Sequence, residues 1–533
     1  MTESSRRRRR RTAPQASPLT PRPESAPAPR RLVVAVVVLA TVAATLERWW
    51  FSGAWGESGS LTSAFYFGDA TRFVEYAQAI AQGRSFDNGI PFHPPGWPLV
   101  MAGLMTLTGP DAAVPVAAIK LLLAGVSGLT VGMAVLLTYE IAGGGAMLAA
   151  ACLGVFNFGH LVQGSVANSE ALYGLLTVTT AWLVWRWLQS DARHPLWWAA
   201  AAGVTGGYAM LVRAEFLACA VILFALAWRA GGVWRRQAAR PALALFVVAY
   251  GLVLVPTGVW HWQTLSAFNA AHVRDVAGPL PRLAPVTSYG PFNFAMANHE
   301  YADGGPNRDH DALDLCDQNT SATLDAGGLD LACPAIYDLY VRGYSIGLSW
   351  LLANPGAALS LLTDKAGMAI GFLAHGYFID NIGAGVDGVR RRVDLVDPAS
   401  RWLLPIHLAL LVAGVVMLRR QPPALGVLSA GLGALIASTL LFYGYVRLGV
   451  AYLPIVWVLQ GTALAALSNR VIGIPWCDRR VIGSVLAALA LLTLLDGARA
   501  RTPRSVALDG ARTTTGMLIE DETLNVVRTP SRR

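Results

Sequence analysis

Charged residues are scarce in this chain, and lysine is almost absent. Only 14% of the 533 residues are charged and 54% are hydrophobic, whereas soluble domains carry about 25% charged residues. Lys120 and Lys365 are the only lysines among 42 basic residues. This composition excludes an ordinary soluble domain. It also argues against a nucleic-acid partner, because the arginines form no continuous basic reading surface.

Cysteine is rare as well, and the spacing of the five residues resembles no zinc site. Cys152 and Cys219 fall within apolar runs, and Cys477 falls in a basic loop. Cys316 and Cys333 share one hydrophilic loop. They are candidates for a disulfide if that loop lies outside the cell, where the environment is oxidising.

Long apolar runs make up most of the remaining sequence. Crossing a bilayer as a helix takes about 20 residues, and runs near this length recur from residue 32 to residue 497. We therefore predict an all-α polytopic membrane protein with about 11 to 13 transmembrane helices. The expected spans are 32–48, 113–138, 144–163, 167–188, 196–212, 216–233, 241–260, 356–375, 402–418, 424–443, 448–468 and 481–497.

The two tails and the membrane domain are distinguished by composition. Residues 1–31 are rich in Pro, Ser and Ala and contain "RRRRRR" at 6–11, which predicts a disordered basic tail. Basic residues before a first span favour a cytoplasmic N-terminus, with binding of anionic lipid as the alternative. Residues 32–497 form the predicted transmembrane domain, and 498–533 form a short C-terminal tail.

This orientation predicts a multi-pass protein of the plasma (inner) membrane with most polar sequence on the extracytoplasmic side. The predicted outer loops are 49–95 and 261–345. The stretch 96–109 is short for a span, and we expect it to be interfacial or partly inserted. The side of 376–401 stays open, because "RRR" at 390–392 favours the inside while the neighbouring basic loops favour the outside.

The stretch "FGDATRFVEYAQAIAQG" at 67–83 predicts an amphipathic helix in the first outer loop. Its apolar positions recur at helical spacing, and Gly83 suits the C-terminal end. Asp69 stands at the N-terminal cap position. It is either only a cap, or a carboxylate held at the membrane surface that is available as a general base.

Six motifs in order give a resemblance to a known family. They are "GDATRFVEYAQAIAQG" with "PPGWPL", "ANSEALYGLL" (167–176), "LVRAEFL" (211–217), "VTSYGPFNFAMANHEYADG" (286–304), "ANPGAALSLLTDKAG" (353–367) and "YGYVRLGVAYLP" (443–454). Together they resemble the GT-C superfamily of membrane glycosyltransferases, in its protein-mannosyltransferase and aminoarabinose-transferase-like branch.

The resemblance implies a polytopic GT-C fold that transfers a monosaccharide from a polyprenyl-phosphate donor with inversion. The acceptor would be a cell-envelope glycan, glycolipid or protein at the extracytoplasmic face. Asp69 matches the catalytic acid, and Glu170 matches the second acid. Glu170 would orient the acceptor or help to hold a divalent cation, Mg²⁺ or Mn²⁺. Its alternative is a helix-start carboxylate that the helix dipole stabilises. Ala70 stands where related branches often carry a further acid, which argues against a tightly bound metal.

The cations in these motifs are candidates for holding the donor phosphate. Arg213, Lys365 and Arg447 each lie near the end of an apolar segment, where an unpaired charge is costly. Their alternative is snorkelling to lipid headgroups. The candidate substrate-binding residues are His93, Asn293, Asn298 and His299, and for His93 a structural role is the alternative.

A transporter or flippase of lipid-linked sugars is the rival interpretation. It would need the same cationic grip on phosphate but no general base. The sequence has no clear internal repeat and no pair of broken helices of the kind that transporters show. A non-catalytic subunit with the same fold is a third possibility, which predicts no donor binding.

Overall fold

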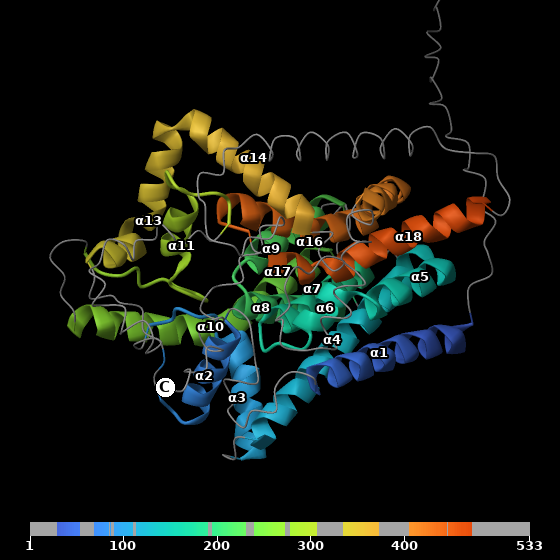
Figure 1. Ribbon diagram of the computed structural model, residues 1–533, viewed down its shortest axis with the longest axis horizontal. Coiled ribbons are helices and arrows are strands. Elements are labelled where there is room, and N and C mark those ends of the chain that lie inside the picture. The colour runs from blue at the N-terminus through green and yellow to red at the C-terminus, as the bar shows by residue number, and fades with distance from the viewer. Residues whose placement is uncertain are drawn as a thin grey trace, which may run out of the picture.

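The computed structural model describes residues 29–53, 69–84, 86, 90–109, 113–189, 195–230, 239–271, 278–305, 334–372, 405–444 and 446–471. Across these ranges the regular structure is helical, with no strand (Figure 1). The predicted span at 481–497, loop 376–401, most of both tails and Cys316, Cys333 and Cys477 lie outside the described residues. The prediction of an all-α membrane protein is confirmed.

The first half of the bundle consists of ten labelled helices. They are α1 (Arg30–Gly53), α2 (Ala70–Ala81), α3 (Gly96–Thr108), α4 (Ala113–Ala142), α5 (Gly144–Val155), α6 (Phe158–Gln163), α7 (Glu170–Leu188), α8 (Pro195–Val212), α9 (Phe216–Ala230) and α10 (Ala239–Ala271). The second half has α11 (Gly290–Ala297), α13 (Pro334–Ala353), α14 (Pro355–Phe372), the helix Pro405–Leu418, α16 (Pro422–Leu441), α17 (Val446–Val450) and α18 (Leu453–Val471).

Several of these helices suit a bilayer by length and composition. Within the described ranges, the four that are long and apolar enough to cross it are Arg30–Trp49, Val116–Ala142, Arg240–Ala271 and Pro422–Leu441. The pair Pro334–Ala353 and Pro355–Ile370 is bent by 110° and would count as a fifth, broken span. Other apolar helices are shorter. The total of about 11 to 13 spans stays a prediction.

Two predicted spans are broken in the structure. The run 144–163 divides into α5 and α6 at Asn157, whose Oδ1 accepts a hydrogen bond of 2.8 Å from the backbone N–H of His160. This side-chain bond starts a new helix in place of continuing the old one. The run 448–468 divides into α17 and α18 just before Pro454, which has no N–H to donate to a preceding turn.

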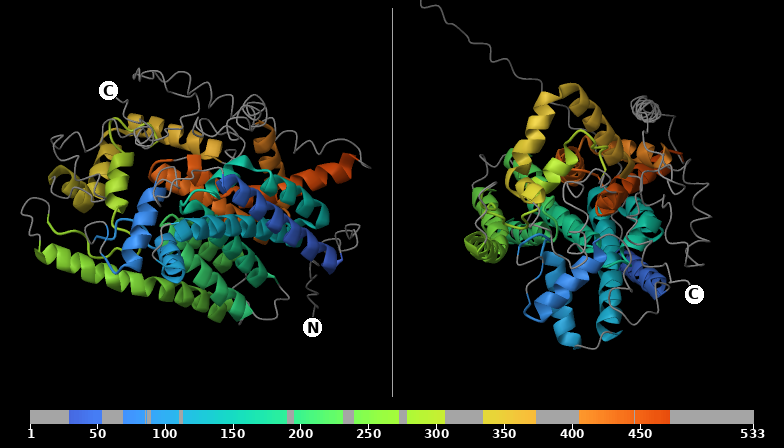
Figure 2. Two further views of the ribbon diagram at one scale, coloured as in Figure 1. Left: turned by 60° about the horizontal axis from the view of Figure 1, so that its bottom comes forward. Right: turned by 60° about the vertical axis from the view of Figure 1, so that its left-hand side comes forward.

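Helix α10 is longer than predicted and extends past the bundle. It runs for 33 residues through Pro256, which corresponds to about 50 Å against a hydrocarbon thickness of about 30 Å. Trp260 and Trp262 are half exposed, and tryptophan is enriched at membrane interfaces. Figures 1 and 2 show the second half of α10 reaching toward α11 and α13.

A small second core joins the outer end of α10 to the neighbouring loops and to α13. Its buried members are Ile90, Leu265, Leu280, Ala284, Ile336, Tyr337 and Tyr340. Backbone bonds reinforce it, because the N–H of Ser288 donates to Pro91 O over 2.7 Å. This loop core fixes the segment that precedes His93 against the segment that precedes α11.

Helix α2 packs against α3, as Figure 1 shows. The helix predicted within 67–83 is confirmed as α2, and Gly83 follows it with φ +65°. Phe73, Val74 and Ala77 of α2 are buried. The amphipathic pattern is therefore explained by packing of the apolar face against protein.

Candidate functional site

Asp69 lies at the start of α2 and does not cap it. Its φ of −81° and ψ of 3° differ from the extended conformation of a capping residue, and its side chain makes no capping hydrogen bond. Its backbone carbonyl accepts from Phe73 N over 2.9 Å. The side-chain capping bond that the cap interpretation expects is therefore not formed. The side chain is half-buried.

The Pro-Pro-Gly-Trp turn at 94–97 docks onto two other motifs. Trp97 is fully buried and its indole N–H donates to Ala167 O over 2.8 Å, three residues before Glu170. Tyr208 donates to Gly96 O over 2.8 Å. A Cβ built on Gly96 would lie 2.7 Å from the backbone of Leu211. Only glycine therefore lets this turn approach the end of α8 so closely.

Arg213 lies in the turn between α8 and α9 and binds two carboxylates. Its Nε and Nη2 donate to the two oxygens of Glu215 over 2.7 and 2.8 Å. Its Nη1 donates to Glu170 Oε1 over 2.8 Å and to Ser169 Oγ over 2.9 Å. The exposed fractions of Arg213, Glu170 and Glu215 are 14%, 1% and 23%. This arrangement is a bidentate ion pair with a second, deeply buried carboxylate beside it.

The charges in this cluster fix its protonation. Burial alone lowers the pKa of a guanidinium, but the carboxylates of Glu215 and Glu170 outweigh it and raise the pKa of Arg213 well above its usual value. Tyr289, from the loop before α11, acts on Arg213 in the same direction. Arg213 therefore stays charged at any physiological pH.

The same cluster reaches the last motif through two tyrosines. The guanidinium of Arg213 lies over the ring of Tyr173, 5.9 Å from its centroid. Tyr173 and Tyr452 are hydrogen-bonded through their hydroxyl oxygens, 2.9 Å apart. Tyr452 lies in the break between α17 and α18, and α17 packs against α6, α7 and α14. The backbone of Arg447 is on α17. Helix α17 thus links α7, which Glu170 begins, to α14, which carries Lys365.

Lys365 and Asn298 form a second polar contact. Lys365, on α14, is fully buried, and its Nζ donates to Asn298 Oδ1 over 2.9 Å and to Leu440 O over 3.4 Å. Asn298 Nδ2 donates to Phe294 O and Leu441 O over 2.8 and 3.0 Å. Two predicted site residues, 67 positions apart, are therefore in direct contact.

The remaining substrate-binding candidates are His93, Asn293 and His299, and each contacts residues of its own surroundings. His93 packs edge-on against Phe73 and Phe92, with ring centroids 5.8 and 4.7 Å apart. Asn293 lies on α11, where its N–H donates to Tyr289 O over 2.9 Å. His299 accepts from Tyr301 N over 3.2 Å. His93 is thus an aromatic neighbour of Phe73, which lies one helical turn after Asp69.

Sequence reasoning missed several residues of the arginine cluster. Glu215 lies in the same "LVRAEFL" motif as Arg213, and a carboxylate two positions from an arginine in a tight turn was the available signal. Ser169 and Tyr173 flank Glu170 in "NSEALY". Tyr452 gave no signal, because an aromatic residue after a short helix is most often ordinary core.

The carboxylates here are committed to arginine in place of a metal. Both oxygens of Glu215 and one of Glu170 accept from Arg213. Among the residues that the structure describes, no group of three or more His, Cys, Asp or Glu side chains could hold a metal ion. Glu170 and Glu215 therefore do not fit a metal-ligand pair in this arrangement.

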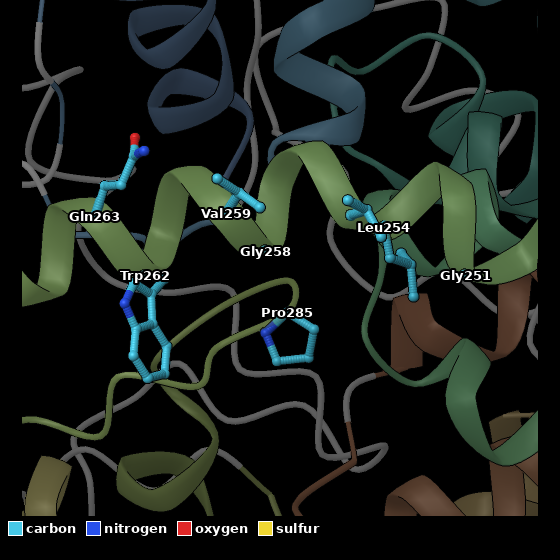
Figure 3. Close-up of a pocket in the computed structure, with 8 residues that line it drawn as sticks. Gly251, Leu254, Gly258, Val259, Trp262, Gln263 and Pro285 are labelled. Carbon is cyan, nitrogen blue, oxygen red and sulfur yellow. The ribbon is translucent and has the colours of Figure 1, made fainter.

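An apolar hollow of about 450 Å³ lies along α10, away from these residues. It is lined by Gly251, Leu254, Val255, Gly258, Val259, Trp262, Gln263 and Pro285. Figure 3 shows Pro285 and Trp262 on the same side of the helix. Val255 and Val259 are more than half exposed. The hollow is part of the apolar outer surface of α10.

No family model and no curated protein matches the chain. Among solved structures it is similar to the Archaeoglobus fulgidus oligosaccharyltransferase in its apo form, with 15% identity over 88% of this chain and a TM-score of 0.45. The chain spans 56% of the length of that protein. It is also similar to ArnT from Cupriavidus metallidurans, apo and bound to undecaprenyl phosphate. The identities are 16% and 15%, over 83% of this chain and 78% and 79% of those chains, with TM-scores of 0.34.

Proposed function

We propose that this protein is an integral-membrane inverting glycosyltransferase of GT-C type. Its donor is a polyprenyl-phosphate monosaccharide, and its acceptor is a cell-envelope glycan, glycolipid or protein. The reaction takes place on the extracytoplasmic side, since a cytoplasmic basic tail before α1 puts Asp69 on the far side of the membrane.

The observation that carries the proposal is the convergence of motifs around the turn at 94–97. Trp97 bonds to the segment before Glu170, Gly96 lies against the end of α8, and Arg213 follows directly and bonds to Glu170. Helix α2, opened by Asp69, packs on the helix that this turn begins. Stretches far apart in sequence supply acids and cations to one end of an apolar bundle, which is the arrangement that a reaction at a membrane surface needs.

The chemistry assigns Asp69 as the general base. As an acceptor hydroxyl oxygen forms its bond to the anomeric carbon, Asp69 takes the hydroxyl proton. The bond from that carbon to the phosphate oxygen breaks on the opposite face of the ring, and its electron pair leaves with the polyprenyl phosphate. The configuration at the carbon inverts. Glu170 is buried and rigidly held, so it suits orientation of the acceptor.

Lys365 and Arg447 supply the positive charge for the departing phosphate. Among the residues that the structure describes, the hydrogen-bond partners of Lys365 are neutral oxygens, so its charge is available to an anion. Helix α17 places Arg447 on an element in contact with α14. Lys365 is fully buried, and a buried cation is costly unless an anionic ligand completes the site.

The test is turnover of a donor panel by the purified protein in lipid nanodiscs. Polyprenyl-phosphate pentoses and hexoses, each labelled in the sugar, are incubated with the protein and with envelope extract as the acceptor. Protein-dependent loss of label from one donor is the expected result. The rival function, flipping of lipid-linked sugars, predicts movement of intact donor across proteoliposomes without cleavage, and that result would replace the proposal.

A further inference from the structure

We infer that Arg213 is a positioning residue for the acids of the site and not a ligand of the donor phosphate. By the same geometry, Glu215 is a further residue required for the reaction. The inference rests on the proposed function, within which it separates the residues that hold the acids from those that bind phosphate.

The hydrogen bonds of Arg213 leave little capacity for another anion. A guanidinium has five N–H groups, and those of Nε, Nη2 and Nη1 already serve Glu215, Glu170 and Ser169 at 2.7 to 2.9 Å. The pair with Glu215 is the two-pronged geometry in which arginine binds oxyanions most strongly. A phosphate would have to displace a carboxylate from this position.

The net charge of the cluster also disfavours phosphate. Two carboxylates surround one guanidinium, so the group as a whole is negative. In a site this enclosed, like charges are poorly screened, and a second anion would be repelled. Lys365 differs, because its Nζ bonds to an amide and a backbone carbonyl. The positive potential for a phosphate therefore lies at Lys365.

What Arg213 does hold is the junction of four elements. Through Glu170 and Ser169 it fixes the start of α7, and through Glu215 it fixes the start of α9. Its contact with Tyr173 continues to Tyr452, at the start of α18. The preceding residue, Val212, lies against the turn at Gly96. Loss of either partner of the Arg213–Glu215 pair would release Glu170 from its single orientation.

The test compares R213Q, E215Q, the double variant and K365Q, with R72Q as the control. Arg72 forms an ion pair with Glu75 on the half-exposed face of α2, at 3.3 Å, so its loss should change little. Two quantities are measured in nanodiscs: the Kd for undecaprenyl phosphate, and the rate of sugar transfer at saturating donor.

We expect R213Q and E215Q each to lower the transfer rate by about 10-fold or more. Because the pair acts as a unit, the transfer rate of the double variant should be within about 3-fold of either single variant. Their Kd for undecaprenyl phosphate should stay within about 3-fold of wild type. K365Q should raise that Kd by about 10-fold or more. A rise in Kd for R213Q that matches K365Q, with normal transfer in E215Q, would overturn the inference.

The midpoint of thermal unfolding keeps this test separate from that of the proposed function. The decreases in the unfolding midpoint that R213Q and E215Q cause should be clearly non-additive in the double variant, whether or not a donor is found. Additive losses would contradict the pairing. If the wild type neither binds undecaprenyl phosphate nor cleaves any donor while the losses are non-additive, the proposed function fails and the structural pairing stands.

Discussion

At the scale of single residues, buried cations connect helices through their hydrogen bonds. Arg48, near the end of α1, is completely buried. Its Nε donates to Ser127 Oγ over 2.6 Å, and its Nη2 lies 3.2 Å from Gly154 O and 2.9 Å from His160 Nδ1. Because a guanidinium can only donate, His160 Nδ1 is the acceptor. Arg48 thus joins α1, α4, α5 and α6.

Replacing Arg48 with Ala should destabilise the bundle. The change leaves a cavity and removes the donor for three buried acceptors, which together cost roughly 3 kcal/mol or more. The expected result is a clearly lower midpoint of thermal unfolding in detergent. Arg31, at the exposed start of the same helix, is the matched control, and R31A should unfold at the wild-type temperature. Equal midpoints for both variants would show that Arg48 is not a structural link.

At the scale of elements, the sequence predicted most helices but not where they break. The expected spans at 196–212 and 424–443 correspond to α8 and α16 within two or three residues, because long apolar runs with clear ends need no tertiary information. The breaks at Asn157 and before Pro454 depend on one side-chain bond and one missing N–H. Hydrophobicity alone predicts neither of these helix breaks.

The close contact between the start of α3 and the end of α8 depends on Gly96. In G96A the new Cβ would lie 2.7 Å from backbone atoms of Leu211 and Val212, closer than atoms can come. The turn must therefore move away from the end of α8, which strains the bond from Trp97 to Ala167 O. We expect a lower unfolding midpoint and transfer reduced by about 10-fold or more. Gly103 is the control on the same helix, since a Cβ there meets nothing within 4 Å.

The variant G103A should be neutral or slightly stabilising, because alanine favours helix more than glycine does. Transfer and unfolding midpoint are measured side by side for the two variants. If G96A behaves like G103A, the turn does not depend on close contact with α8, and the docking of the motifs would lose its main support.

At the scale of the whole molecule, the motifs around Trp97, Glu170, Arg213 and Tyr452 meet at one end of an apolar bundle. The starts of α3, α7 and α9, the end of α8 and the junction of α17 and α18 meet there. The outer half of α10 and the loop core extend beyond the same end. The cytoplasmic N-terminus that we propose would make this end face outward.

Labelling of single cysteines tests this orientation. With the native cysteines replaced by Ser, Y301C and W197C are introduced at side chains that are 54% and 67% exposed. Trp197 is near the start of α8, and Arg213 follows the end of that helix. A membrane-impermeant maleimide should label Y301C in intact cells and W197C only after permeabilisation. The reverse pattern would place the candidate site in the cytoplasm and exclude an extracytoplasmic transferase.

The site itself was only partly predictable from sequence. Asp69 stood out as the acid that opens an amphipathic helix, Glu170 through its motif, and Lys365 as one of two lysines. The partnership of Arg213 with Glu215 was not evident, since whether an arginine faces a carboxylate or a ligand depends on side-chain directions in a tight turn. The contact between Lys365 and Asn298 spans 67 positions, and local sequence carries no information on it.

The most direct measurement of the central claim is donor turnover by D69N beside E75Q. Each variant removes one carboxylate, either the one just before α2 or one within it. Glu75 is half-exposed in an ion pair with Arg72. If Asp69 is the general base, D69N should bind undecaprenyl phosphate with a Kd within about 3-fold of wild type, and its transfer rate should fall by about 100-fold or more. E75Q should keep normal transfer. Undiminished transfer by D69N would contradict the account.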